Sequence, residues 1–259
     1  IIMPLFTGLL SFYFTKDKQG PLMGYSSALN MLGGVIATLI AGGLAMISWR
    51  LSFLVYLLGL ISIVLCIIWM PNDRIYDNKK SSRSSGQMKQ YASFIAVMFV
   101  TSFTFFVYPA SFAMECAASG AIPQDLIAII MAMMDVFGFA GGLIFSSISK
   151  KISRGARFIA PVLFIIAYLL LGVVGGAFGV VAGSAFLGVA NGIGVPFIMT
   201  SASAKAGRDA ATTVMPLISA ALYLAQFATP LILSAVSQFV SVNSFVIALF
   251  AAVLLVFVS

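Results

Sequence analysis

The stretch PNDRIYDNKKSSRSSGQMKQ, residues 71–90, is the one long polar segment in an otherwise apolar chain of 259 residues. It is rich in serine and lysine and has no apolar periodicity, which is typical of a linker. Apolar runs border it on both sides, at residues 50–70 and 91–117. We therefore expect residues 71–90 to be a partly disordered linker between two groups of apolar helices.

The composition of the whole chain indicates that its solvent is lipid. Hydrophobic residues make up 61% of it and charged residues 8%, and the mean hydropathy is +1.12, whereas a soluble domain carries about 25% charged residues. A bilayer core needs about 20 apolar residues in helical form, and continuous rather than alternating apolar runs favour helices over a β-barrel. The sequence therefore predicts nine spans, at residues 1–14 (short), 22–46, 50–70, 91–117, 123–149, 157–174, 176–200, 210–238 and 242–259.

The positive charges indicate which ends of these spans share one side of the membrane. Thirteen of the fourteen Lys and Arg residues lie in four gaps between spans, at residues 15–20, 71–90, 150–157 and 205–209. Because basic residues beside spans stay on the cytoplasmic side, we expect these four loops to be cytoplasmic, in what we interpret as a bacterial inner (plasma) membrane. The same argument accounts for the net charge of +7 without nucleic acid as a partner.

The chain lacks the residues for several kinds of chemistry. It contains no His, which excludes His-based acid–base catalysis, Ser–His and Cys–His nucleophile pairs and most zinc sites. Its two Cys residues, Cys66 and Cys116, lie inside apolar runs and are interpreted as small buried side chains. We therefore expect a protein that is not an enzyme, with no catalytic residue, metal site or cofactor.

An internal repeat links the two ends of the chain. When the sequence is compared with itself at an offset of 192 residues, three short sequence features align: Pro4 with Pro196, Lys16-Asp17 with Arg208-Asp209, and Ser27-Ala28 with Ser219-Ala220. Internal repeats are a recurrent construction of secondary transporters. Under this offset the first and last predicted spans are shorter than their counterparts, so we expect a chain that is clipped at both ends.

Four groups of residues carry a resemblance to a known family. They are the glycine-rich run LNMLGGVIATLIAGGL (29–44) preceded by Gly24, the turn Ser48-Trp49-Arg50 followed by Phe53, the basic loop GGLIFSSISKKISRGAR (141–157), and Gln226-Phe227-Ala228-Thr229-Pro230. With these motifs the chain resembles the major facilitator superfamily, and the glycine-rich run resembles the signature of its drug/proton-antiporter branch.

The resemblance implies a fold and a domain organisation. Members have twelve membrane helices in two six-helix bundles that a basic cytoplasmic loop joins. We therefore expect an all-α polytopic membrane protein with about nine of the twelve helices, whose residue 1 lies in the fourth span. Residues 1–70 would then be the remainder of the N-terminal bundle, 71–90 the linker and 91–259 the C-terminal six-helix bundle.

Asp135 is the first candidate for a functional residue. It lies ten residues past Asp125, so roughly 15 Å into its helix. Gly138 and Gly142, three and seven residues further, place it on a protein-facing side of that helix. Ionisable groups at this depth mark a substrate pathway or a proton relay by default. We interpret Asp135 as a protonatable carboxyl group of the pathway, with a purely structural interhelical hydrogen bond as the alternative.

Other polar residues inside spans are weaker candidates for the same pathway. Glu115 is either a second relay group or a carboxylate at the outer water boundary. Asn30, Asn191 and Gln226 carry amides at membrane depth, and the resemblance implies that Asn191 and Tyr108 face the substrate. Each of the neutral groups is open to a second interpretation, as a hydrogen bond that holds two helices together.

Glycines and prolines within the predicted spans are candidates for close helix packing or for a hinge. Small residues let helix backbones approach one another, and proline interrupts the hydrogen bonds of a helix. The candidates are Gly33, Gly34, Gly42, Gly141, Gly142, Pro196 and Pro230.

Together these features predict a secondary active transporter that works by alternating access. Acidic groups without mid-membrane Lys or Arg favour proton-coupled export of a small neutral, hydrophobic or cationic solute. The expected partners are the lipid bilayer, the solute and protons. Two alternatives stay open: an importer of small metabolites from the same superfamily, and a non-transporting polytopic protein such as a receptor or assembly factor.

Overall fold

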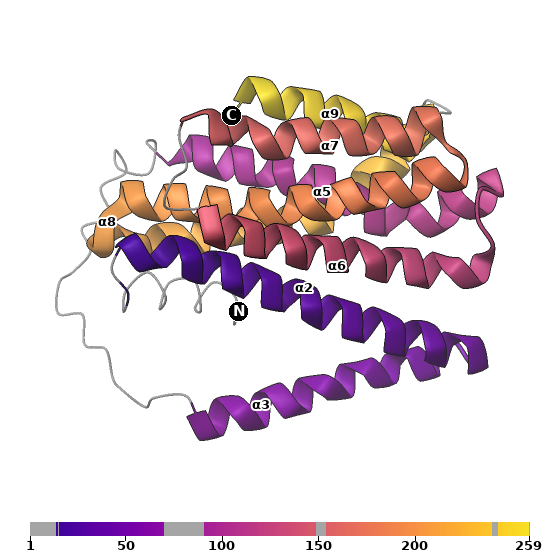
Figure 1. Cartoon of the computed structure of the whole chain (residues 1–259), viewed down its shortest axis with the longest axis horizontal. Coiled ribbons are helices and arrows are strands. Elements are labelled where there is room, and N and C mark those ends of the chain that lie inside the picture. The colour runs from indigo at the N-terminus through magenta and orange to yellow at the C-terminus, as the bar shows by residue number, and fades with distance from the viewer. Residues whose placement is uncertain (1–13, 15, 70–90, 149–153, 240–242, 259) are drawn as a thin grey trace.

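The computed structural model of the protein describes residues 14, 16–69, 91–148, 154–239 and 243–258, and within these ranges every regular element is a helix (Figure 1). A helix satisfies its backbone N–H and C=O groups internally, which lipid cannot do for an extended chain. The predicted fold class, an all-α polytopic membrane protein, is confirmed.

The helices follow one another in a simple order along the chain. They are α2 (Lys16–Ile47), η1 (Leu51–Leu57), α3 (Leu58–Trp69), α5 (Ala92–Ser119), α6 (Gln124–Ile148), η3 (Arg154–Phe158), α7 (Ile159–Leu169), η4 (Leu170–Val174), α8 (Gly176–Phe239) and α9 (Ser244–Val258).

Eight of the nine predicted spans correspond to apolar helical segments. Five segments are long enough to cross a bilayer, at Pro21–Ile47, Ala92–Ser119, Gln124–Ser147, Gly176–Ala206 and Val214–Phe239. Three shorter ones cover Leu51–Leu65, Ile159–Val174 and Ser244–Phe257. The span predicted at residues 1–14 falls almost entirely outside the described residues.

The element α8 is helical over 64 residues, yet it folds back on itself. Asn191 and Gln226 line the same cavity, although 35 residues of straight helix would separate them by about 52 Å. The element therefore consists of two arms, 176–206 and 214–239, which run side by side in the bundle (Figure 1). These arms are the two spans predicted at 176–200 and 210–238.

Two of the four predicted basic loops are helical in the structure. Residues 16–20 form the first turns of α2, and residues 205–209 belong to α8. Charged residues can continue a helix beyond the apolar core, because the hydrocarbon layer limits only the apolar part of a helix. At 150–157 the described part begins with η3, and residues 71–90 lie outside the described ranges.

Glycines with positive φ make two of the connections between helices. Gly120 (φ 63°) ends α5, where its N–H donates to the Cys116 carbonyl at 3.0 Å. Gly175 (φ 60°) separates η4 from α8, whose first residue, Gly176, also has a positive φ (62°). L-residues with side chains rarely adopt this conformation, which explains the choice of glycine at both turns. The connections fall in gaps between predicted spans, between 91–117 and 123–149 and at residue 175.

Helix α6 packs between α2 and the first arm of α8, and glycines permit both approaches. A Cβ added to Gly142 would stand 2.9 Å from the Ala28 backbone nitrogen in α2. On the other side, a Cβ on Gly141 would stand 2.8 Å from the Val189 carbonyl oxygen of α8. In lipid, helices associate through such close van der Waals packing rather than through the hydrophobic effect.

The larger of the two hydrophobic cores among the described residues lies mainly among α5, α7, α9 and the first arm of α8. Tyr108 and Tyr168 are fully buried there, and Tyr108 stacks on Phe112 with ring centroids 4.3 Å apart. The Tyr168 hydroxyl donates a hydrogen bond to the Thr104 carbonyl of α5. By contrast, α3 diverges from α2 and the described side chains of α3 are exposed, which suits a lipid-facing helix (Figure 1).

Candidate functional site

A cavity of about 380 Å³ lies between α2, α5, α6 and both arms of α8. Pockets for small-molecule ligands usually measure about 300–1,000 Å³, so this volume is sufficient for one. It is lined by Met23, Ser26, Ser27, Asn30, Met31, Gly34, Ser102, Phe105, Phe106, Asp135, Asn191, Val195, Pro196, Met199, Ser219, Leu222, Tyr223 and Gln226.

Each helix contributes one face to the cavity. On α2 the lining positions are 23, 26, 27, 30, 31 and 34, and on the second arm of α8 they are 219, 222, 223 and 226. Both sets follow the i, i+3, i+4, i+7 spacing of one side of an α-helix. The cavity is therefore a product of regular helix geometry, not of irregular loops.

These two faces are related by the internal repeat. At the predicted offset of 192 residues, four of the six lining positions of α2 map onto those of the second arm of α8: Ser27 onto Ser219, Asn30 onto Leu222, Met31 onto Tyr223, and Gly34 onto Gln226. Equivalent helices of the repeat thus present equivalent faces to one cavity. This arrangement is typical of sites that lie at the interface of two repeats.

Asp135 is the only charged side chain among the described residues that line this cavity. It is half-buried, and its carboxylate lies against Gly34 of α2, where an added Cβ would stand 2.7 Å from Oδ2. On the same side of α6, Gly138 faces Met31 of α2, with an added Cβ 3.0 Å from the sulfur. The carboxylate therefore occupies space at the contact of α6 with α2 that a larger residue at position 34 would fill.

Four of the six polar residues predicted for the pathway meet in this cavity: Asp135, Asn30, Asn191 and Gln226. Asp135, Asn191 and Gln226 lie near the middle of the segments Gln124–Ser147, Gly176–Ala206 and Val214–Phe239. Asn191 is 4% exposed, whereas Asn30 and Gln226 are exposed. The cavity thus gathers hydrogen-bonding groups of four helical segments at mid-membrane depth.

Tyr108 does not line the cavity, contrary to the expectation that it faces the substrate. Its hydroxyl lies 2.7 Å from Ser184 Oγ in the core of α5, α7 and α8. The cavity face of α5 carries Ser102, Phe105 and Phe106, and the helical period turns Tyr108 about a third of a turn away from it. In this structure the Tyr108 hydroxyl makes a hydrogen bond between α5 and α8. This is the second interpretation that the sequence left open.

Glu115 also lies away from the cavity. Its Oε1 accepts a hydrogen bond of 2.8 Å from the backbone N–H of Ser244, the first residue of α9. A carboxylate at a helix N-terminus satisfies an otherwise unpaired N–H group and complements the helix dipole. Glu115 therefore joins the end of α5 to the start of α9, a role that neither sequence interpretation included.

Several cavity residues were missed by the sequence analysis. Among them are Ser26, Ser102 and Tyr223. Ser102 is 2% exposed, and within the described part of the chain its Oγ has no hydrogen-bond partner. The signal for α2 was present in the sequence, because Ser26 and Asn30 lie one turn apart in its predominantly apolar segment Pro21–Ile47. No comparable signal marks Ser102, since its neighbours in α5 include several other hydroxyl residues.

The glycines and prolines predicted for packing or hinge motion fall into different environments. Gly34, Gly42, Gly141 and Gly142 lie close to neighbouring helices, whereas a Cβ at Gly33 would meet no atom of the described residues within 4 Å. Gly33 thus makes no close approach to a described helix, and a role for it in packing or as a hinge stays a prediction. Both prolines lie inside α8, Pro196 in the first arm beside the cavity and Pro230 in the second arm.

The cavity can bind a ligand but offers little for covalent chemistry. Across the described ranges, no three or more His, Cys, Asp or Glu side chains gather as a metal site would require. The lining combines one carboxylate with amides, hydroxyls, aromatic rings and methionines. Such a lining suits a small organic molecule, and a single carboxylate favours a positively charged one.

Comparisons with known proteins agree with this architecture. A family model described as Major Facilitator Superfamily matches residues 1–230. A search of the curated proteins gives no match to the chain.

Proposed function

The chain belongs to the Major Facilitator Superfamily of secondary transporters, and we propose that it takes part in proton-coupled export of a small neutral, hydrophobic or cationic solute through the cavity between α2, α5, α6 and α8. The observation that carries this proposal is the position of Asp135. It is a lone carboxylate among the described lining residues, at the midpoint of an apolar span.

The environment of the amides supports an aqueous pathway. Asn30 and Gln226 are exposed, although each lies within a segment apolar enough to span a bilayer. Polar side chains at this depth rarely face lipid and instead meet a water-filled cavity or a neighbouring helix. A solute path between the two repeat-related faces gives both amides a polar environment.

The repeat supports alternating access as the mechanism. We assign residues 1–70 and 91–259 to two bundles joined by 71–90, with the basic segments on the cytoplasmic side. In this scheme the contact between α2 and α6 is a contact between bundles, and Asp135 lies in it beside Gly34. Rocking of one bundle against the other would change the surroundings of the carboxylate, which is a physical basis for coupling its proton to the motion.

The absence of Lys and Arg among the described lining residues bears on the substrate. A site for phosphate or carboxylate solutes usually carries a cationic partner. Together with the aromatic rings Phe105 and Phe106 and the sulfur of Met31, the lone carboxylate favours a hydrophobic or cationic solute. The glycine-rich run at 29–44 supports placement in the drug/proton-antiporter branch.

Transport by the full-length protein in proteoliposomes with an imposed proton gradient tests the proposal. Asp135→Asn keeps the volume of the side chain and removes its charge, and we expect it to abolish proton-driven movement of a cationic solute. Asp125→Asn is the matched control, because Asp125 is an exposed acid in the first turn of the same helix. Unchanged coupling in Asp135→Asn would remove this carboxylate from the mechanism.

A further inference from the structure

A buried hydroxyl without a hydrogen-bond partner lines the cavity that holds Asp135. It belongs to Ser102 of α5, which is 2% exposed and whose Oγ has no partner among the described residues. By contrast, the hydroxyl of Thr104, two residues further along α5, donates to the Val100 carbonyl at 2.8 Å. A buried hydroxyl that makes no hydrogen bond is unfavourable. The Ser102 hydroxyl can therefore gain a partner from a molecule that enters the cavity.

Two aromatic rings accompany Ser102 on the same face of α5. Phe105 and Phe106, three and four residues further, also line the cavity, and their ring centroids lie 5.2 Å apart. Side chains at this spacing are neighbours on one side of a helix. On the α5 side, a ligand therefore meets one hydrogen-bonding group beside an apolar surface.

Ser102 and Asp135 lie at different depths in the bundle. Helices α5 and α6 are joined by a short turn and run in opposite directions from it (Figure 1). Ser102 lies 17 residues before Ser119, the last residue of α5, which is about 25 Å of helix. Asp135 lies 11 residues after Gln124, the first residue of α6, which is about 16 Å of helix. A ligand that contacts both groups must therefore span at least about 9 Å.

The rest of the lining suits the apolar middle of such a ligand. Much of it is apolar, with Met23, Met31, Val195, Met199 and Leu222. Methionine side chains are flexible and adapt to the shape of an apolar partner. At about 380 Å³, the cavity is large enough to enclose a whole small molecule.

We propose that Ser102 determines which cations the cavity accepts, by making a hydrogen bond with a second polar group of the solute. This role rests on the proposed function, in which Asp135 attracts the positive charge. The solute is then an elongated organic amine with a hydroxyl, carbonyl or amide group at least about 9 Å from its nitrogen. A cation without that group leaves the Ser102 hydroxyl unpaired, and sites reject analogues that leave their buried polar groups unpaired.

The amines 8-amino-1-octanol and nonylamine measure this selectivity, because they differ only in a terminal hydroxyl in place of a methyl group. Both carry the ammonium group that Asp135 attracts. Their binding to the full-length protein in lipid nanodiscs is measured by isothermal titration calorimetry, with empty nanodiscs as the blank. We expect Ser102→Ala to weaken binding of 8-amino-1-octanol roughly two- to tenfold and to leave that of nonylamine within about twofold of the wild type.

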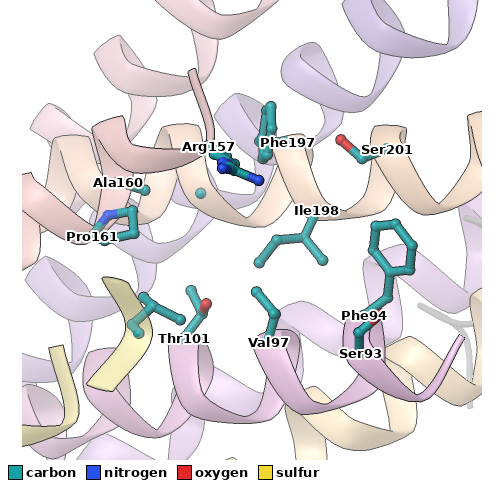
Figure 2. Close-up of a pocket in the computed structure, with 12 residues that line it drawn as sticks. Ser93, Phe94, Val97, Thr101, Arg157, Ala160, Pro161, Phe197, Ile198 and Ser201 are labelled. Carbon is teal, nitrogen blue, oxygen red and sulfur yellow. The ribbon is translucent and has the colours of Figure 1, made fainter. Parts of the chain in front are cut away.

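Thr101→Val is the matched control. Thr101 precedes Ser102 on α5, is 1% exposed, and its Oγ1 also has no partner in the described part of the chain. However, it lines a separate cavity of about 180 Å³, which shares no lining residue with the first (Figure 2). Both substitutions remove an unpaired buried hydroxyl, so neither should lower thermal stability. Only Ser102→Ala should change the affinity for 8-amino-1-octanol.

A third variant separates the role of Ser102 from the proposed function. Asp135→Asn should weaken binding of both amines by a similar factor, since both carry the positive charge. If it leaves both affinities unchanged while Ser102→Ala remains selective, the role of Asp135 is wrong and that of Ser102 stands. The role of Ser102 is overturned by equal effects of Ser102→Ala on the two amines, by an equal loss in Thr101→Val, or by no measurable binding of 8-amino-1-octanol to the wild type.

Discussion

The contact between Gly34 and Asp135 yields a sharp prediction for Gly34→Ala. A Cβ at Gly34 would stand 2.7 Å from Oδ2 and 3.1 Å from Cγ of Asp135. The neighbouring Gly33 offers an internal control, because a Cβ there would meet no atom of the described residues within 4 Å. Alanine at position 34 therefore displaces the carboxylate, whereas alanine at the adjacent position 33 touches no described atom.

The size of the effect follows from the distance. An ordinary van der Waals contact of a Cβ begins at 3.4 Å, whereas the Cβ added at position 34 would stand 2.7 Å from Asp135 Oδ2. The carboxylate oxygen must therefore move away from it by about 0.7 Å. Displacing a side chain by about 30° from its preferred torsion costs about 0.5–1.5 kcal/mol. If the position of the carboxylate determines transport, that cost corresponds to a roughly two- to tenfold loss of proton-driven transport rate.

Proteoliposome transport under an imposed proton gradient and thermal unfolding measure the two consequences separately. Replacing glycine by alanine inside a helix favours the helix by up to about 1 kcal/mol. We expect Gly33→Ala to keep wild-type transport with equal or higher stability. Gly34→Ala should lose transport while its stability changes little, because the gain in helix propensity offsets the cost of moving Asp135.

A double-mutant cycle identifies the cause of the loss. In an Asp135→Ala background the shorter side chain leaves room for the new Cβ, so Gly34→Ala should raise thermal stability by the full gain in helix propensity, up to about 1 kcal/mol. Equal transport in Gly33→Ala and Gly34→Ala would refute the reasoning. So would an equal effect of Gly34→Ala on stability in the wild-type and Asp135→Ala backgrounds.

Three further predictions concern the packing around the site. Glu115→Ala should lower the free energy of unfolding by about 1 kcal/mol, since it removes the acceptor for the Ser244 N–H at the start of α9. A loss of proton coupling without a loss of thermal stability would instead indicate that Glu115 is a relay group. Tyr108→Phe should cost about 0.5–1.5 kcal/mol for its hydrogen bond to Ser184 and leave KM unchanged, and a raised KM would place the hydroxyl on the solute path. Gly192→Ala should lower the free energy of unfolding by about 1–3 kcal/mol or more, because the new Cβ would overlap the Gly138 carbonyl of α6. A variant as stable as the wild type in thermal unfolding would contradict the observed contact between α6 and α8.

Much of the fold was predictable because membrane helices are local structures. An apolar run of sufficient length must form a helix in lipid, whatever its neighbours do. The spans therefore agree with the structure within a few residues, for example 91–117 against Ala92–Ser119. The basic gaps at 15–20 and 205–209 were less predictable as loops, because a helix continues past the apolar core wherever no residue stops it.

The candidate site was predictable only in part. Asp135 stood out because a carboxylate at mid-membrane depth is costly and rare. The family resemblance placed Tyr108 on the pathway, and residue type made Glu115 a candidate for it. The orientation of both side chains depends on packing partners distant in sequence, Ser184 and Ser244. Residue type and depth are local properties, but the helix face that meets the cavity is not.

By itself, the sequence determined that this chain is a polytopic helical membrane protein, and its motifs indicated the superfamily to which it belongs. Composition and run length suffice for the first conclusion because the bilayer imposes the same requirement on every span. Only the tertiary structure decided that helix continues through 205–209 between the two predicted spans of α8, and that faces of α2 and α8 line one cavity. It also decided that Asp135 lies against Gly34. These outcomes depend on the angle at which each helix packs against its neighbours. That angle is set by contacts between side chains that are distant in the sequence.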